Sequence, residues 1–103
     1  MKTANSNGTS YIFLKKIVTN TSSNSEGDKL YFALIQAKRQ GHSAVLVADN
    51  DHSFASSFLN SSVGRFIDEF GLKDFKCHFK FKGTKSQFDR INNYLTTCEE
   101  IFS

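Results

Sequence analysis

The segment 44–71 constrains the fold of this chain more than any other stretch. It opens with Ala-Val-Leu-Val-Ala, the longest wholly apolar run in the sequence, which is typical of a strand buried on both faces. We therefore expect Val45 and Val47 to be almost fully buried. Apolar residues then recur at helical spacing, which predicts an amphipathic helix over 52–71 that ends in a left-handed cap at Gly71. A buried strand joined directly to such a helix is typical of a domain in which helices pack on a sheet.

Patterning along the rest of the chain predicts further strands and helices. Ser25, with Asp28 three positions later, resembles a capping box and begins a helix that Gly41 ends. Thr84, with Gln87, begins the last helix in the same way. β-forming residues or strict alternation indicate the other strands. In chain order the expected elements are a strand at 11–18, a helix at 25–40, a strand at 43–48, a helix at 52–71, a strand at 74–82 and a helix from residue 84.

The order of these elements, β-α-β-α-β-α, predicts an α/β fold with a mostly parallel or mixed sheet. The strand at 74–82 alternates apolar and basic residues, so one of its faces should meet water. This favours helices packed mainly on one face of the sheet. With 103 residues the chain is large enough for one hydrophobic core and too small for two. We therefore expect a single domain over 11–103, preceded by a disordered tail at 1–10.

Composition and motifs exclude several classes of protein. The longest apolar run is too short to span a membrane, and the first residues lack the apolar core of a secretory signal, so we expect a cytoplasmic protein without a membrane partner. Phosphate loops, nucleophile elbows and zinc-protease motifs are missing from the sequence, so we expect no enzyme, no cofactor and no metal. Cys77 and Cys98 match no metal or redox spacing and are expected to be buried, reduced thiols. The last helix is expected to bury Phe88 on the same stripe as Cys98.

The residues that follow the apolar strand resemble a known family. An acidic turn, then Ser-Ser-Phe-Leu, Gly64 and an apolar helix are similar to the STAS-like domain family of uncharacterised prokaryotic proteins, and the resemblance extends over about 25–95. More distantly, the chain resembles the STAS domains of bacterial anti-sigma factor antagonists. Those domains carry an Asp-Ser-Ser-Gly-Leu-Gly-type segment at this place, and its first serine is phosphorylated. Here Ser56 stands at that serine, whereas Ala55 and Phe58 replace the preceding aspartate and the first glycine.

The resemblance implies a STAS-like domain that acts as a non-catalytic protein-interaction or signalling module. Its partner would be a protein with a kinase-type ATP-binding domain, docked through the turn and helix start at 49–60. Phosphorylation of Ser56 would change the local charge by roughly −2, enough to break or create that docking surface. A simpler interpretation is that the serines cap the helix or allow close packing. The expected partner-binding residues are Asp49, Asp51, Ser53, Ser56, Ser57 and Asn60.

A row of lysines gives an alternative function. Lys76, Lys80 and Lys82 alternate along the strand at 74–82 and could track a phosphate backbone, as in a small nucleic-acid-binding protein. We favour a solvated face, because the aromatic residues of that strand point the other way and exposed lysines also protect sheets from aggregation. The net charge of +3 is too small to argue for nucleic acid by itself.

A third function, the least favoured, is that of a metal-dependent enzyme. Asp49 and Asp51 are separated by one residue and could hold Mg²⁺, with His52 nearby. The same residues are typical of a turn that leads into a helix. We favour the turn, because the sequence offers no third carboxylate or phosphate-binding loop beside them.

Overall fold

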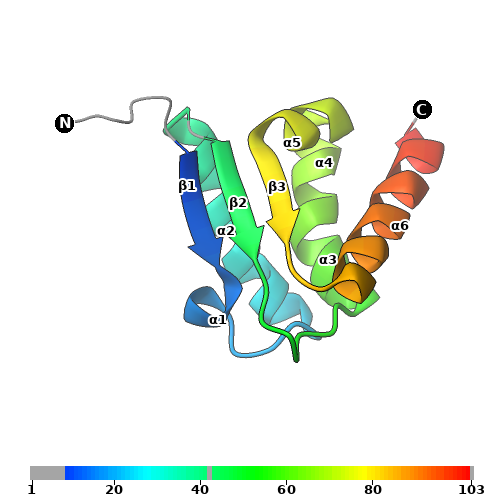
Figure 1. Cartoon of the computed structure of the whole chain (residues 1–103). Helices are drawn as coiled ribbons and strands as arrows, with labels where there is room; N and C mark the ends of the chain where they lie inside the picture. The colour runs from blue at the N-terminus through cyan, green and yellow to red at the C-terminus, as the bar shows by residue number, and fades with distance from the viewer. Residues whose placement is uncertain (1–8, 42, 103) are drawn as a thin grey trace.

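Three parallel strands form one sheet in the computed structural model, which describes residues 9–41 and 43–102. The strands β1 (Thr9–Phe13), β2 (Ser43–Val47) and β3 (Phe79–Lys82) lie in the order β1-β2-β3, so β2 is central (Figure 1). Both pairs of neighbours are parallel. Parallel neighbours need crossover connections, and helical segments supply them. The expected α/β fold is therefore confirmed.

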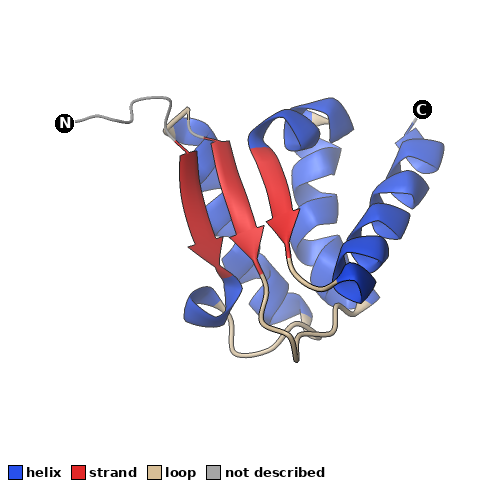
Figure 2. Ribbon diagram, viewed as in Figure 1, coloured by secondary structure: helices blue, strands red, loops and turns tan. Residues whose placement is uncertain are grey.

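Helical segments occupy the connections and the C-terminal part of the described chain. They are α1 (Leu14–Ile17), α2 (Asn24–Arg39), α3 (Ser56–Leu59), the π-helical segment η2 (Asn60–Gly64), α4 (Arg65–Phe70), α5 (Leu72–His78) and α6 (Lys85–Phe102). The segments α3, η2 and α4 form one continuous helix, since Asn60, Gly64 and Arg65 all have right-handed helical dihedral angles. Figure 2 shows α2 and α4 behind the sheet, α6 beside β3 and no described helix in front of the sheet. Within the described residues, no helix has both the length and the apolar character needed to cross a membrane.

Helices cover one face of the sheet and leave the other face to solvent. The register aligns Tyr11 with Val45 and Val45 with Lys80, so these residues share one face. On it Tyr11 is exposed and the two valines of β2 are only half-buried, while Leu46 on the opposite face is buried. The expectation that Val45 and Val47 would be almost fully buried is wrong, because no described helix packs on their face.

The strand expected at 74–82 is shorter than its alternating pattern indicated. Only β3 is extended, and the residues before it form α5. Leu72, Phe75 and Phe79 have the three- and four-residue spacing of a helix face, and all three pack in or against the core. Burial of Leu72 and Phe75 on α5 therefore replaces the first part of the expected strand, and Phe79 is the first residue of β3. Cys77, which was expected to be buried, projects from α5 and is exposed.

The strand expected at 11–18 is also shorter. The strand β1 begins two residues earlier than expected and ends before Leu14, which starts α1. Leu14 is buried in the core, and its carbonyl accepts a hydrogen bond from the Val18 N–H at 2.9 Å. The chain therefore leaves the strand at Leu14 and forms one helical turn, with the Leu14 side chain in the core. Of the tail expected at 1–10, residues 1–8 lie outside the described residues.

The cap of α2 is Ser23 and not Ser25 as expected. Ser23 Oγ accepts a hydrogen bond from the Glu26 N–H at 3.3 Å. The Glu26 carboxylate pairs with Lys29 Nζ at 2.8 Å and accepts from the Thr19 N–H at 2.6 Å. The Lys29 ammonium and the Thr19 N–H together hold the pKa of Glu26 below its usual range. The stabilisation that Glu26 gives the loop before α2 is present at neutral pH and is lost only as the pH falls through this lowered pKa.

The cap of α6 is the one expected. The Thr84 N–H donates to Gln87 Oε1 at 2.9 Å, and the Gln87 N–H donates to Thr84 Oγ1 at 3.2 Å. Cys98 is buried on α6 as expected, and burial raises the pKa of its thiol. Phe88 was expected on the same buried stripe but is 46% exposed, because α6 packs beside β3 and not on a face of the sheet.

The π-helical segment η2 contains serines whose hydroxyl groups bond to the helix itself. A π-helix has wider turns than an α-helix and is rare outside short segments. Ser62 is fully buried, and its Oγ donates to the Phe58 carbonyl at 2.7 Å. Ser61 Oγ donates to the Ser57 carbonyl at 3.1 Å. Ser61 Oγ also donates to the Asn24 carbonyl of α2 at 3.0 Å. Ser62 therefore bonds to its own helix, whereas Ser61 also joins η2 to α2.

Phe58 and Phe66 fill the core between the continuous helix and the sheet, as expected. Both side chains are fully buried. The Phe66 ring centroid lies 4.9 Å from that of Phe70, 5.9 Å from Phe75 and 5.3 Å from Phe79. Phe66 thus joins α4, α5 and β3.

Replacing Phe66 with alanine should lower the free energy of unfolding by about 3–5 kcal/mol, because it leaves a cavity where these elements meet. Urea denaturation monitored by circular dichroism measures this change. Phe32→Ala is the matched control, since Phe32 on α2 is 61% exposed and should cost only about 0.5 kcal/mol. Equal losses in the two variants would contradict the proposed core.

Gly27 lets α2 approach the continuous helix closely. A Cβ at this position would contact Ser61 Oγ and would lie 2.6 Å from the Phe58 carbonyl oxygen. A side chain can move away from such a contact, but a helix backbone cannot do so without disturbing its hydrogen bonds.

Gly27→Ala should therefore destabilise the domain by about 1–3 kcal/mol, although alanine is the better helix former. Ser25→Ala is a matched control on the exposed side of the same helix and should be nearly neutral. Thermal and urea unfolding of both variants test this, and a Gly27→Ala variant more stable than the natural chain would show that α2 can move aside.

Candidate functional site

Two loops meet at the carboxyl end of the sheet, where open α/β sheets present their binding groups. One loop, 18–23, follows α1, and the other, 48–55, follows β2. Thr21 Oγ1 donates to the Ser53 carbonyl at 2.6 Å, and the Ala55 N–H donates to the Thr21 carbonyl at 3.0 Å. These bonds fix the chain immediately before α3.

The helix expected at 52–71 begins later, at Ser56. The preceding residues form a turn, in which the His52 N–H donates to the Asp49 carbonyl at 3.1 Å, and then an extended segment held by the other loop. Gly71 ends the helix with a φ of +94°, which favours glycine. Its ψ of 154° is extended, so the expected left-handed cap is replaced by a direct turn into α5.

The first turns of α6 hold the loop 48–55 from the other side. Gln87 Nε2 donates to the Asp49 carbonyl at 2.6 Å and to the His52 carbonyl at 2.8 Å. Arg90 Nε donates to the Phe54 carbonyl at 3.0 Å. Neither α6 residue was predicted as part of the site, because their partners lie more than thirty positions earlier in the chain and no local pattern connects them.

Ser56 lies on the surface at the start of α3. Its side chain is exposed, and its Oγ accepts a hydrogen bond from Arg90 Nη2 at 3.2 Å. Ala55, which precedes it, supplies no side-chain cap. The structure therefore places an accessible hydroxyl group beside a guanidinium group that is itself oriented by the backbone.

Two of the other expected docking residues bond to neighbouring elements. Ser57 Oγ donates to the Ser22 carbonyl at 2.7 Å, so this hydroxyl joins α3 to the loop 18–23. Asn60 Oδ1 accepts from the Tyr94 hydroxyl at 2.7 Å, which joins the helix to α6. The expected docking residues with exposed side chains are Asp51, Ser53, Ser56 and Asn60.

Asp49, Asp51 and His52 lie close together in the turn. One ligand atom from each lies within 4.8 Å of the others, as a metal ion would require. His52 Nδ1, however, accepts a hydrogen bond from the Asp49 N–H at 3.2 Å, and the Asp49 carboxylate lies 4.0 Å from Lys15 Nζ. Lys15 supplies positive charge where a cation would bind, and the observed bonds are those of a turn.

The three lysines expected on one strand come from two elements. Lys76 projects from α5, whereas Lys80 and Lys82 project from β3. The expected basic strand over 76–82 is therefore wrong for Lys76. Lys80 and Lys82 pair with Val45 and Val47, so they lie on the open face of the sheet.

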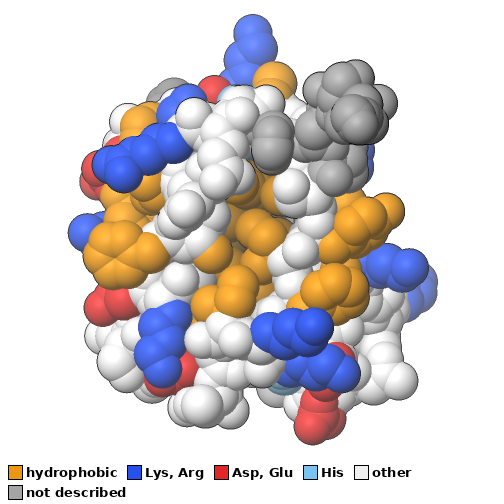
Figure 3. All heavy atoms as spheres, turned by 90° about the vertical axis from the view of Figure 1, so that its left-hand side faces the viewer, with side chains coloured by type: hydrophobic (Ala, Val, Ile, Leu, Met, Phe, Trp, Pro, Cys, Tyr) orange, Lys and Arg blue, Asp and Glu red, His pale blue; other side chains and the backbone are white. Residues whose placement is uncertain are grey.

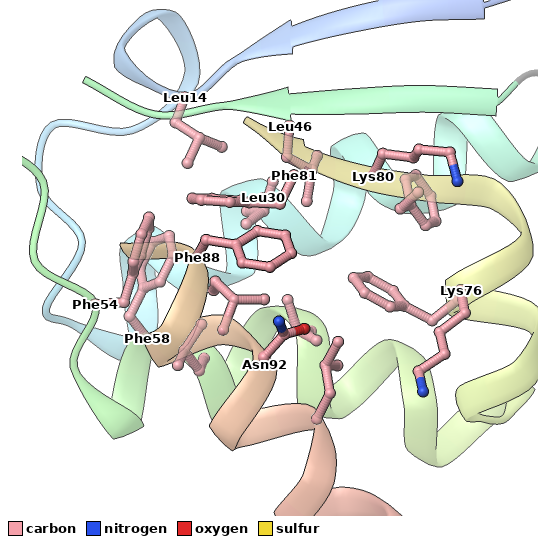
Figure 4. Close-up of a pocket in the computed structure, with 16 residues that line it drawn as sticks. Leu14, Leu30, Leu46, Phe54, Phe58, Lys76, Lys80, Phe81, Phe88 and Asn92 are labelled. Atoms are coloured by element: carbon pink, nitrogen blue, oxygen red, sulfur yellow. The ribbon is translucent and has the colours of Figure 1, made fainter. Parts of the chain in front are cut away.

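An apolar cleft of about 380 Å³ is lined by β3, α5, α6 and the continuous helix (Figure 4). Phe54 and Phe58 lie at one end, Lys76 and Lys80 lie at the other, and Phe88 lies between them. Ligand pockets of proteins run from roughly 300 to 1,000 Å³, so the cleft could take a small apolar group. The sequence gives no signal for this cleft, because it depends on the distance between α6 and β3.

Replacing Gln87 with methionine should cost about 1–3 kcal/mol of unfolding free energy, because it keeps the side-chain length but leaves the Asp49 and His52 carbonyls without their donor. Gln36→Met on the exposed side of α2 is the matched control and should be nearly neutral. Amide hydrogen exchange of residues 49–55 should also become faster in Gln87→Met. Unchanged exchange would show that α6 does not hold this loop.

Comparison with known proteins agrees with the architecture. A family model described as a STAS-like domain of unknown function (DUF4325) matches residues 26–89, from the first turn of α2 to the first turns of α6. No curated protein and no solved structure gives a significant match. The match covers more than half of the chain and includes β2, the continuous helix and β3, so the expected resemblance is confirmed. The chain belongs to the family of STAS-like domains of unknown function.

Proposed function

We propose that this domain is a non-catalytic protein-interaction module that docks a partner through the 49–60 turn and helix start, and that phosphorylation of Ser56 switches the docking. The observation that carries this proposal is the exposed Ser56 hydroxyl group beside Arg90. The resemblance of this segment to anti-sigma factor antagonists also supports Ser56 as the phosphorylated residue.

Arg90 is suited to hold a phosphate on Ser56. A phosphoserine carries about −1.5 to −2 charges and three acceptor oxygens at neutral pH. Arg90 Nη2 already lies 3.2 Å from Ser56 Oγ, while its Nε is bonded to the Phe54 carbonyl. A guanidinium group fixed in this way can bind phosphate oxygens with little further loss of side-chain entropy.

The docking surface is also rigid. Thr21, Ser57 and Gln87 tie the turn and the helix start to the loop 18–23 and to α6. Binding a partner would therefore require little ordering of the chain, which favours affinity. The bonds of the polar groups at this site run mainly to backbone groups, as expected of a docking surface and not of a catalytic centre.

The resemblance suggests a partner with a kinase-type ATP-binding domain. In the phosphorylation step Ser56 Oγ would form a bond to the γ-phosphorus of ATP, the bond between that phosphorus and ADP would break, and the hydroxyl proton would pass to a base of the kinase. The added charge would make the 49–60 surface, which also contains Asp49 and Asp51, more acidic. A partner surface that is apolar or acidic would then dissociate.

The test compares Ser56→Asp and Ser56→Ala in binding to ATPase-domain proteins of the native host, first by pull-down and then by calorimetry with the purified partner. Ser56→Asp should weaken binding by about tenfold or more, and Ser56→Ala should leave it nearly unchanged. Ser43→Asp is a matched control, because Ser43 is exposed at the opposite end of β2. Mass spectrometry of the protein from its host should also find a phosphoryl group on Ser56.

Two results would contradict different parts of the proposal. Equal affinities of the natural chain and Ser56→Asp would show that Ser56 is not a switch. Failure of the natural chain to retain any ATPase-domain protein, or equal loss of binding in Ser43→Asp, would show that the 49–60 surface does not dock such a partner.

A further inference from the structure

The open face of the sheet combines aromatic and basic side chains. The register places Tyr11, Val45 and Lys80 in one row across the strands and Phe13, Val47 and Lys82 in the next. Tyr11 is 60% exposed and Phe13 is 42% exposed. Figure 3 views the molecule from the β1 edge of the sheet, where hydrophobic side chains gather between the lysine and arginine side chains of the surface.

The two aromatic rings lie next to each other on β1. Their centroids are 6.4 Å apart and their planes differ by 27°, so they form a nearly continuous aromatic platform. Lys16 Nζ lies 5.5 Å from the centroid of the Phe13 ring. An exposed platform of this kind can stack planar groups, and the neighbouring ammonium group favours a ligand that is also anionic.

The basic side chains of this face are available to such a ligand. Lys80 and Lys82 form no ion pair with any residue in the described part of the chain, whereas Lys29, Lys38 and Lys85 on the helices each pair with a carboxylate. The strand residues aligned on this face from 11 to 13, 45 to 47 and 80 to 82 include no acid. The positive charges of Lys80 and Lys82 are therefore not neutralised by any acid among the described strand residues of this face.

We propose that this face binds single-stranded nucleic acid, with bases stacked on Tyr11 and Phe13 and phosphates held by Lys16, Lys80 and Lys82. Neighbouring strands lie about 4.8 Å apart, so β1 and β3 are about 10 Å apart and one nucleic-acid strand can contact both. Stacking on aromatic residues and neutralising phosphates with lysines are the two interactions that single-strand binding uses. An apolar protein surface would cover the rings but would leave the lysine charges without partners.

The proposed nucleic-acid surface differs from the interpretation of Lys80 and Lys82 as part of a solvated face, which the sequence favoured. The aromatic residues of β3, Phe79 and Phe81, do point to the covered face. The aromatic residues that accompany Lys80 and Lys82 come from β1 instead, which only the strand order reveals. A duplex would bind more weakly than a single strand, because its bases are stacked on one another and cannot reach Tyr11.

Fluorescence anisotropy with a labelled oligo-dT or oligo-U of about 12 nucleotides tests the proposal. Binding should weaken between about 50 and 200 mM salt, with a slope of log K against log salt near −2 for three phosphate contacts. Lys80→Gln with Lys82→Gln should reduce that slope by about 1.4. Tyr11→Ser should weaken binding by about fivefold or more through loss of stacking.

The chain offers a matched control for each change. Phe32→Ser removes an aromatic side chain that is 61% exposed on α2, on the other side of the sheet, and should leave binding unchanged. Lys73→Gln with Arg39→Gln removes the same charge from α5 and α2 and should leave the salt slope nearly unchanged. Circular dichroism confirms that each variant is folded before its affinity is compared.

Three outcomes would overturn the proposal. The first is the absence of binding at low salt, and the second is equal loss of binding in Tyr11→Ser and Phe32→Ser. The third is a concentration-dependent dimer by analytical ultracentrifugation that Tyr11→Ser disperses, which would show that a second copy of the chain covers this face. The assays use no partner protein and no phosphorylated chain, so their result is independent of the docking function.

Discussion

Burial of Phe58 and Phe66 against a single face of the parallel sheet is the constraint on which the other features depend. Both residues belong to the continuous helix from α3 to α4, which packs with α2 on the face that carries Leu46. With these helices on one side, the opposite side of the sheet meets solvent. The last helix, α6, packs at the edge of β3, and the cleft, the exposed Phe88 and the open aromatic face all follow from that arrangement.

The residues of the two proposed sites lie partly inside and partly outside the segment that the family model matches. The matched segment 26–89 holds the central strand, the helix with Ser56, and β3. Arg90, which contacts Ser56, lies just beyond it, and Tyr11 on β1 lies before it. Tyr11 and Lys16 thus lie before the matched segment and Arg90 lies after it, whereas Ser56, Lys80 and Lys82 lie within it.

Several features that depend on residues close together in the sequence, such as one helix cap and one helix end, were predicted correctly. The capping box of Thr84, the end of α2 before Gly41 and the central strand were all read correctly. The strand at 74–82 was wrong because its residues fit both an alternating and a helical spacing, and burial of Phe75 in the core decides between them. Arg90 could not be predicted as part of the site, because its contacts arise only when α6 packs against the loop after β2. The open face could likewise not be predicted, because it depends on the strand order, which places Tyr11 and Lys80 in one row on either side of Val45.

The π-helical turn sets the directions in which the two halves of the continuous helix point their side chains. A five-residue π segment contains one residue more than the α-helix needs to cover the same rise, and each residue of an α-helix turns the chain by about 100°. Phe58 and Phe66 are eight residues apart, and at this spacing a plain α-helix would point their side chains about 80° away from each other. Because η2 takes up one residue, the two side chains keep nearly the relative direction of a seven-residue spacing, and both are buried in the core. The π-helical turn thus allows one helix to carry Ser56 at its start and to bury both Phe58 and Phe66 along its length.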